Sequence, residues 1–130
     1  MREIKFRAWN SIDKKMVGWC SLKHSFDAFI KSKHYELMQF TGLTDKNGVD
    51  IYEGDILESV SEMVNVANYP VKTGEMKRTL KVVSYDDSKG AFVTPNSIVA
   101  TMSQSIISKY SIVVGNIHQN HELLENKSEN

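Results

Sequence analysis

Short apolar stretches separated by polar turn residues follow one another along most of the chain. At the start, Ile4, Phe6 and Ala8 alternate with charged or larger residues, which is the period-two pattern of a half-buried strand. A polar turn over residues 10–15 leads into 16–20, which is typical of a returning strand. The first 20 residues therefore predict an N-terminal β-hairpin.

The middle of the chain carries the strongest turn signals. Strands are predicted over 35–40 and 56–60 because both stretches are apolar and bounded by turn residues. Between them, the Asn-Gly pair that ends at Gly48 favours a turn with positive φ. Gly54 permits a second tight bend, in which the carboxylate of Asp55 is expected to accept backbone N–H bonds.

The second half predicts further strands with one long interruption. Residues 61–76 contain Pro70 and Gly74 among mixed polar residues and predict a long loop or irregular excursion. Strands are predicted over 79–85, 91–94 and 110–117. The Ser-rich stretch 96–109 has only a weak hydrophobic pattern.

Helical patterns are few and brief. Ser25 can cap a short helix in which Phe26, Phe29 and Ile30 share one face, and Asn120 can open a single helical turn. Short strands between Gly, Asp and Asn turns, with at most short helices, predict a mainly β fold such as a small barrel.

Composition and charge narrow the function classes. With 130 residues, 41% of them hydrophobic and 25% charged, the chain is sized for one ordinary globular domain. Sixteen basic and sixteen acidic side chains cancel, so no overall field attracts polyanions or anionic membranes. Cys20 is the single cysteine, and no apolar run approaches the roughly 20 residues that span a bilayer. We therefore expect a cytoplasmic protein with no signal peptide and no membrane partner.

Three blocks of the sequence resemble the YopX family of phage and prophage proteins. They are the opening MREIKFRAWN, the segment LMQFTGLTDKNGVDIYEGDIL and the closing VVGNIHQNHELLE, in the family's order. The resemblance implies an N-terminal β-hairpin-rich portion over 1–50, a C-terminal SH3-type β-barrel over 51–125 and a frayed tail at 126–130. The 61–76 excursion would then be an enlarged barrel loop. The resemblance also implies a phage or prophage origin and a host-cytoplasmic location, and it brings no established activity.

One set of residues has metal-ligand chemistry. Cys20 with His24, and His118 with His121, can each bring two ligands to one side of a local structure. One Cys with three His is not a common structural zinc set, and nothing in the sequence makes the two pairs meet. We expect no metal site.

Catalytic patterns are missing from the sequence. It has no nucleophile elbow, P-loop or dinucleotide fingerprint, and Cys20 lies in an apolar strand candidate, where a thiol usually fills core space. Asp50, Glu53 and Asp55 suit turn capping and solvent better than acid–base work. The prediction is a protein that is not an enzyme and uses no cofactor.

Association with protein is the favoured function, because several alternating strands offer edges that can pair with a second copy or with a host or phage partner. The alternative is a nucleic-acid-binding module with a basic and aromatic N-terminal face, for which Arg7, Trp9 and Tyr52 are the candidate residues. The neutral net charge disfavours this alternative, since nucleic-acid binders usually show a basic footprint.

Overall fold

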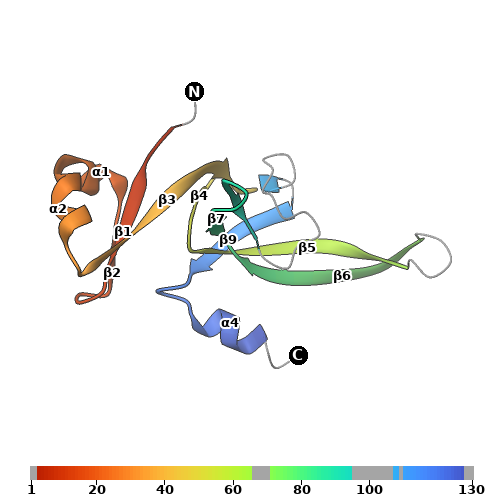
Figure 1. The fold of residues 1–130 in the computed structure, drawn as a ribbon. Coiled ribbons are helices and arrows are strands. Elements are labelled where there is room, and N and C mark those ends of the chain that lie inside the picture. The colour runs from red at the N-terminus through yellow and green to blue at the C-terminus, as the bar shows by residue number, and fades with distance from the viewer. Residues whose placement is uncertain (1–2, 66–70, 95–106, 109, 128–130) are drawn as a thin grey trace.

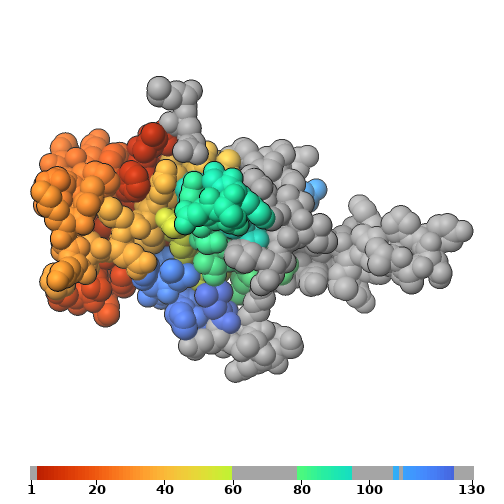
Figure 2. All heavy atoms as spheres, viewed as in Figure 1, coloured from red at the N-terminus to blue at the C-terminus, as the bar shows by residue number. Residues whose placement is uncertain are grey.

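The chain folds as a mainly β protein with short helices at its two ends (Figure 1). The computed structural model describes residues 3–65, 71–94, 107–108 and 110–127. The N-terminal strands and helices form one end of the molecule, and the hairpin of β7 (Ser84–Asp86) and β8 (Ala91–Val93) lies in the middle of the face seen in Figure 2.

The N-terminal sheet has four antiparallel strands in the order β2-β1-β3-β4. Their bounds are β1 Phe6–Asn10, β2 Lys15–Val17, β3 Tyr35–Thr44 and β4 Asp50–Tyr52. The predicted N-terminal hairpin is confirmed, since β1 and β2 pair in antiparallel register from Ala8 opposite Val17.

Three short helical segments cover one face of β1. They are α1 (Trp19–Leu22), η1 (Lys23–Ser25) and α2 (Phe26–Lys31). The ring of Phe6 packs against Trp19 at 6.1 Å and against Phe26 at 5.1 Å between centroids, which buries apolar area on this face. The helix predicted after Ser25 is confirmed, although the Ser25 side chain makes no capping hydrogen bond.

The strand predicted over 16–20 is wrong at its end. The strand stops at Val17, and Gly18 is the N-cap of α1 because its extended backbone leads directly into the helix. Cys20 therefore lies on a helix and is exposed, so it does not fill core space as expected.

The C-terminal part holds a three-stranded sheet in the order β6-β5-β9 and a separate hairpin of β7 with β8. The bounds are β5 Asp55–Asn65, β6 Val71–Val82, β7 Ser84–Asp86, β8 Ala91–Val93, β9 Ser111–Asn116 and, after them, helix α4 Glu122–Lys127. A buried apolar cluster connects this part to the N-terminal sheet and comprises Ile51, Leu57, Val83 and Ile107, with Leu43 and Val113 packed against it. The cluster joins β4 to β5 and β9, because burying apolar area favours their contact.

The long loop predicted at 61–76 is wrong for every residue of it that the structure describes. Residues 61–65 continue β5, and residues 71–76 belong to β6, with Ser61 opposite Lys77. The remaining part, 66–70, lies outside the described residues, as does most of the Ser-rich stretch 96–109. Of the predicted frayed tail, residues 126–127 belong to α4, and 128–130 lie outside the described residues.

Two glycines adopt the backbone that the sequence predicted. Gly48 has φ +81° and Gly54 has φ +90°, in the left-handed region that side chains rarely enter. The two sites differ in space. A Cβ at Gly54 would lie 3.1 Å from Sδ of Met38, whereas at Gly48 it would meet nothing within 4 Å.

We predict that Gly54→Ala lowers the free energy of unfolding by about 1–3 kcal/mol, because it combines backbone strain with a close contact. Urea unfolding followed by fluorescence measures it. Gly48→Ala should lower the free energy of unfolding by less, because it adds backbone strain without a close contact. Gly18→Ala should change little, because Gly18 has φ −79° and open space around its Cβ position. Equal effects at Gly54 and Gly18 would contradict this account.

Candidate functional site

The turn from Tyr52 to Asp55 lies where the two parts of the molecule meet. Its backbone binds three different segments: Glu53 N–H donates to the Gln39 carbonyl on β3, Gly54 N–H donates to the Val83 carbonyl, and the Gly54 carbonyl accepts from Ile117 N–H, each at 2.9 Å. The tight bend that Gly54 allows thus places consecutive peptide groups against β3, the end of β6 and the end of β9.

A buried ion pair adds β1 to this junction. Nη2 of Arg7 lies 2.7 Å from Oδ1 of Asp55, with 13% and 2% of the two side chains exposed. The other carboxylate oxygen accepts the Tyr52 N–H at 2.7 Å, which confirms the predicted capping role of Asp55. The guanidinium also lies over the Tyr52 ring, 4.8 Å from its centroid, a cation–π arrangement.

Burial shapes the ionisation of Asp55. Loss of solvent raises the pKa of Asp55 above its ordinary value, while the Arg7 charge and the Tyr52 N–H work in the opposite direction. The ionised carboxylate therefore depends on Arg7, because without it the desolvation cost has little to offset it.

Lys5, the residue before β1, forms a second ion pair near this junction. Its Nζ lies 2.6 Å from Oδ2 of Asp50 and 4.6 Å from the centroid of the Phe40 ring. The hydrogen bond to Asp50 raises the pKa of Lys5, against the opposing effect of burial. Lys5 precedes β1 and Arg7 lies within it, two residues further on, and both present their cations to the β4 region.

Trp9 is covered by a ring from the C-terminal end of the chain. Its side chain stacks on His118 with centroids 5.2 Å apart and planes at 12°, and Trp9 is only 7% exposed. Nε2 of His118 lies 3.1 Å from Oε2 of Glu36, yet the two groups are not aligned for a hydrogen bond.

The three residues predicted to bind nucleic acid are thus engaged within the fold. Arg7 and Tyr52 come together around Asp55, and Trp9 packs under His118. A stacking platform needs exposed rings, and this placement leaves little of Arg7 or Trp9 for a ligand to contact. The nucleic-acid alternative stays a prediction that these two side chains do not favour.

The structure separates the two halves of the Cys and His set. Cys20 and His24 lie on α1 and η1, whereas His118 and His121 follow β9. Within the described part of the chain, no group of three or more His, Cys, Asp or Glu side chains could hold a metal ion.

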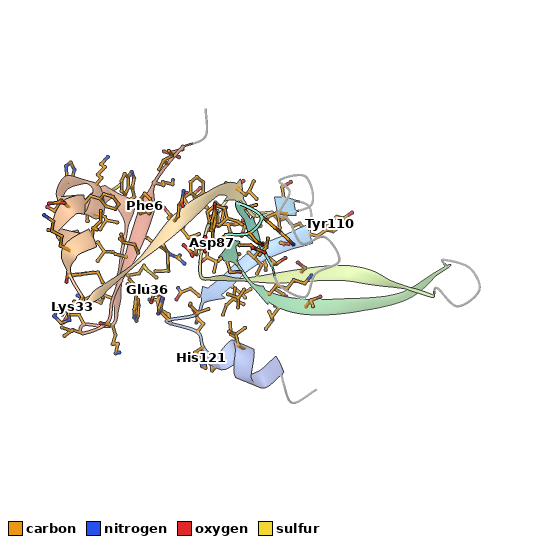
Figure 3. All side chains as sticks on the ribbon, in the orientation of Figure 1. Phe6, Lys33, Glu36, Asp87, Tyr110 and His121 are labelled. Atoms are coloured by element: carbon orange, nitrogen blue, oxygen red, sulfur yellow. The ribbon has the colours of Figure 1, made fainter. Side chains whose placement is uncertain are left out.

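A cavity of about 160 Å³ opens beside the turn at Gly54. Its lining residues come from the start of β3, the 53–54 turn, the β6–β7 bend and the segment after β9: Glu36, Leu37, Met38, Glu53, Gly54, Val82, Val83, Ser84 and Ile117. Glu36, labelled in Figure 3, and Glu53 are the charged members of this set. Glu53 was predicted to face solvent, but it is half-buried and accepts a long hydrogen bond of 3.4 Å from Gln39 N–H.

Comparison with known proteins gives a family and a structural relative. The profile of the YopX protein family matches residues 5–125. The crystal structure of protein EF1440 from Enterococcus faecalis is similar, with a TM-score of 0.66 and 27% identity over 95% of this chain and 99% of that chain. No curated protein matches. Among the described residues, no helix has the length and apolar character needed to cross a membrane.

Replacing Arg7 by Met should cost about 3–5 kcal/mol of unfolding free energy near neutral pH, because it leaves the Asp55 carboxylate buried without a countercharge. In the variant, the pKa of Asp55 in the folded state lies further above its value in the unfolded state. The loss of unfolding free energy is therefore greatest above this folded-state pKa, where Asp55 is ionised, and it shrinks as pH falls towards about 4. Urea unfolding of both proteins at a series of pH values measures this difference.

The control is Lys31→Met, which removes an ion pair with Asp27 whose side chains are 75% and 82% exposed. Its loss should be about 0.3–0.5 kcal/mol, as for other exposed helical pairs. The account is contradicted if Arg7→Met lowers the unfolding free energy no more than the control does, or by an amount that does not change with pH. Either result would show that the buried Asp55 carboxylate does not need the Arg7 charge.

Proposed function

The chain belongs to the YopX family, and we propose that it acts without catalysis, by pairing an extended β arm with a strand of another polypeptide. The β5–β6 arm consists of residues 60–65 and 71–78, which pair with each other beyond the reach of β9. The partner is a second copy of the chain or a protein of the phage or its host. The host-cytoplasmic setting follows from the phage and prophage resemblance of the sequence blocks.

The pairing register carries the proposal. β9 pairs with β5 only from Asp55 to Ser59, while β5 pairs with β6 as far as Asn65 opposite Val71. Among the described strands, none lies against either outer edge of the arm. Figure 1 shows this hairpin extending past β9 and away from the rest of the fold.

Open strand edges favour association. Each edge presents unpaired N–H and C=O groups that can accept a further strand. A two-stranded hairpin by itself is marginally stable in water, so a third strand would stabilise the arm as well as bind it. Residues 60–65 extend about 20 Å at about 3.3 Å per residue, which is the usual length of a strand. The register shift between Glu62 and Val64 leaves the pairing from Val60 to Glu62 regular.

The same proposal keeps the SH3-type barrel for the C-terminal part. The first and last strands of this part, β5 and β9, pair with each other, as the closure of a sheet into a barrel requires. The apolar cluster around Leu57 and Val83 supplies an interior for such a barrel. In this arrangement the arm is an enlarged hairpin that leaves the barrel between its first two strands.

Size-exclusion chromatography with light scattering tests the proposal. We predict that the full chain self-associates at micromolar concentration and that a variant without the arm does not. In that variant an Asn-Gly turn replaces residues 61–77, which joins Val60 to Arg78, its cross-strand partner. The control keeps both arm strands and replaces only 66–70 with Gly and Ser residues, and it should associate like the full chain.

A full chain that is monomeric throughout would remove self-association. The partner would then be sought by capture from lysogenic host lysate with the full chain and the armless variant side by side. The proposal fails if both proteins are monomeric and capture the same set of proteins. Circular dichroism and thermal unfolding show whether the armless variant keeps its fold.

A further inference from the structure

The cavity beside Gly54 has an apolar floor and an acidic rim. Met38 and Val83, which are 3% and 1% exposed, line it together with the buried Gly54. Leu37, Val82 and Ile117 extend the apolar wall. Glu36 and Glu53 line the same space. The Glu36 side chain is 62% exposed, whereas Glu53 is half-buried and its Oε1 accepts the Gln39 N–H.

The carboxylates at the rim have few basic neighbours: Nε2 of His118 lies 3.1 Å from Oε2 of Glu36. In the described part of the chain, neither Glu36 nor Glu53 has an ion pair with a lysine or arginine. Arg7 does hydrogen-bond the Glu53 carbonyl at 3.3 Å, but its charge is matched by Asp55 at 2.7 Å. Lys5 is likewise held by Asp50. The rim therefore keeps a negative charge that a ligand can meet.

The size of the cavity limits what can enter. At about 160 Å³ it is well below the roughly 300–1,000 Å³ of clefts that enclose drug-sized ligands. It fits a group of side-chain size. An aliphatic chain gains binding free energy by contact with the apolar floor, and a cationic group gains it beside the carboxylates of the rim. Lysine and arginine side chains combine these two parts, an apolar stem and a charged end.

We propose that this cavity binds an alkylammonium or alkylguanidinium group, with its aliphatic stem on Met38, Val83 and Ile117 and its cation between Glu36 and Glu53. The ligand chemistry is shared by a lysine or arginine side chain of a polypeptide and by a free small diamine. None of the lining residues lies in the β5–β6 arm, so this site is independent of the proposed strand pairing.

Titration of the 15N-labelled full chain with small probes tests the site by amide shifts at Gly54, Val83 and Ile117. The probes are the blocked tripeptides acetyl-Gly-Lys-Gly-amide and acetyl-Gly-Arg-Gly-amide, the diamine 1,4-diaminobutane, and a blocked tripeptide with norleucine in place of lysine. We expect saturable shifts with a dissociation constant of about 1 mM or weaker for the cationic probes, as suits a contact of this size. Tighter binding of the tripeptides identifies a polypeptide source, and tighter binding of the diamine identifies a free amine.

The double variant Glu36→Gln with Glu53→Gln should weaken the cationic probes about tenfold, since it removes the charge and keeps the size and the acceptor for Gln39 N–H. The matched control is Glu122→Gln, an exposed glutamate at the start of α4 that does not line the cavity. Three results would each overturn the assignment. The norleucine peptide could bind as well as the lysine peptide, the double variant could bind the cationic probes like the control, or no probe could cause amide shifts. The amide spectrum of the double variant reports whether its fold is intact.

Discussion

The ion pair between Arg7 and Asp55 is the contact on which the arrangement of this fold depends. Asp55 begins β5, and its carboxylate binds the guanidinium of β1 with one oxygen and the Tyr52 N–H with the other. Its backbone carbonyl accepts the Val83 N–H at 2.9 Å. One residue thus connects the first strand of the chain to the C-terminal sheet. Because a buried charge is costly without its partner, the two parts are favoured together over either alone.

The neighbouring peptide groups strengthen this junction. The N–H of Gly54 donates to the Val83 carbonyl, and the Gly54 carbonyl accepts the Ile117 N–H. A side chain at this position would lie too close to Met38. The junction also creates the acidic cavity, since the same bend sets Glu53 and Gly54 against the start of β3 and the end of β6. Fold and candidate binding site therefore share one structural cause.

Local patterns predicted the parts of the fold that local chemistry controls. The positive φ of Gly48 and Gly54 and the capping by Asp55 follow from short-range geometry, and the sequence reports such geometry directly. The partner of Asp55 could not be predicted in this way, because Arg7 is 48 positions away and an alternating strand suggests that its polar face is solvated. In this fold both faces of β1 are covered, one by the rings of Phe6, Trp19 and Phe26 and the other by ion pairs.

The loop predicted over 61–76 differs from the observed strands for a related reason. Strand prediction relies on alternation between apolar and polar positions, and residues 61–76 mix polar and small apolar residues without that alternation. Pro70 and Gly74 added turn signals to that stretch. The cavity escaped prediction because its members come from four separate segments, and only the tertiary fold brings Glu36 near Glu53.

Native-state hydrogen exchange tests most directly whether the junction makes one cooperative unit. Phe40 N–H bonds the Lys5 carbonyl in the N-terminal sheet, and Ile117 N–H bonds the Gly54 carbonyl in the C-terminal part. If the ion pair and the turn unite the two parts, both amides should exchange only through global unfolding, with the same free energy and the same dependence on denaturant. Exchange of Phe40 through a smaller opening, while Ile117 stays protected, would show that the N-terminal sheet unfolds independently and would contradict the account.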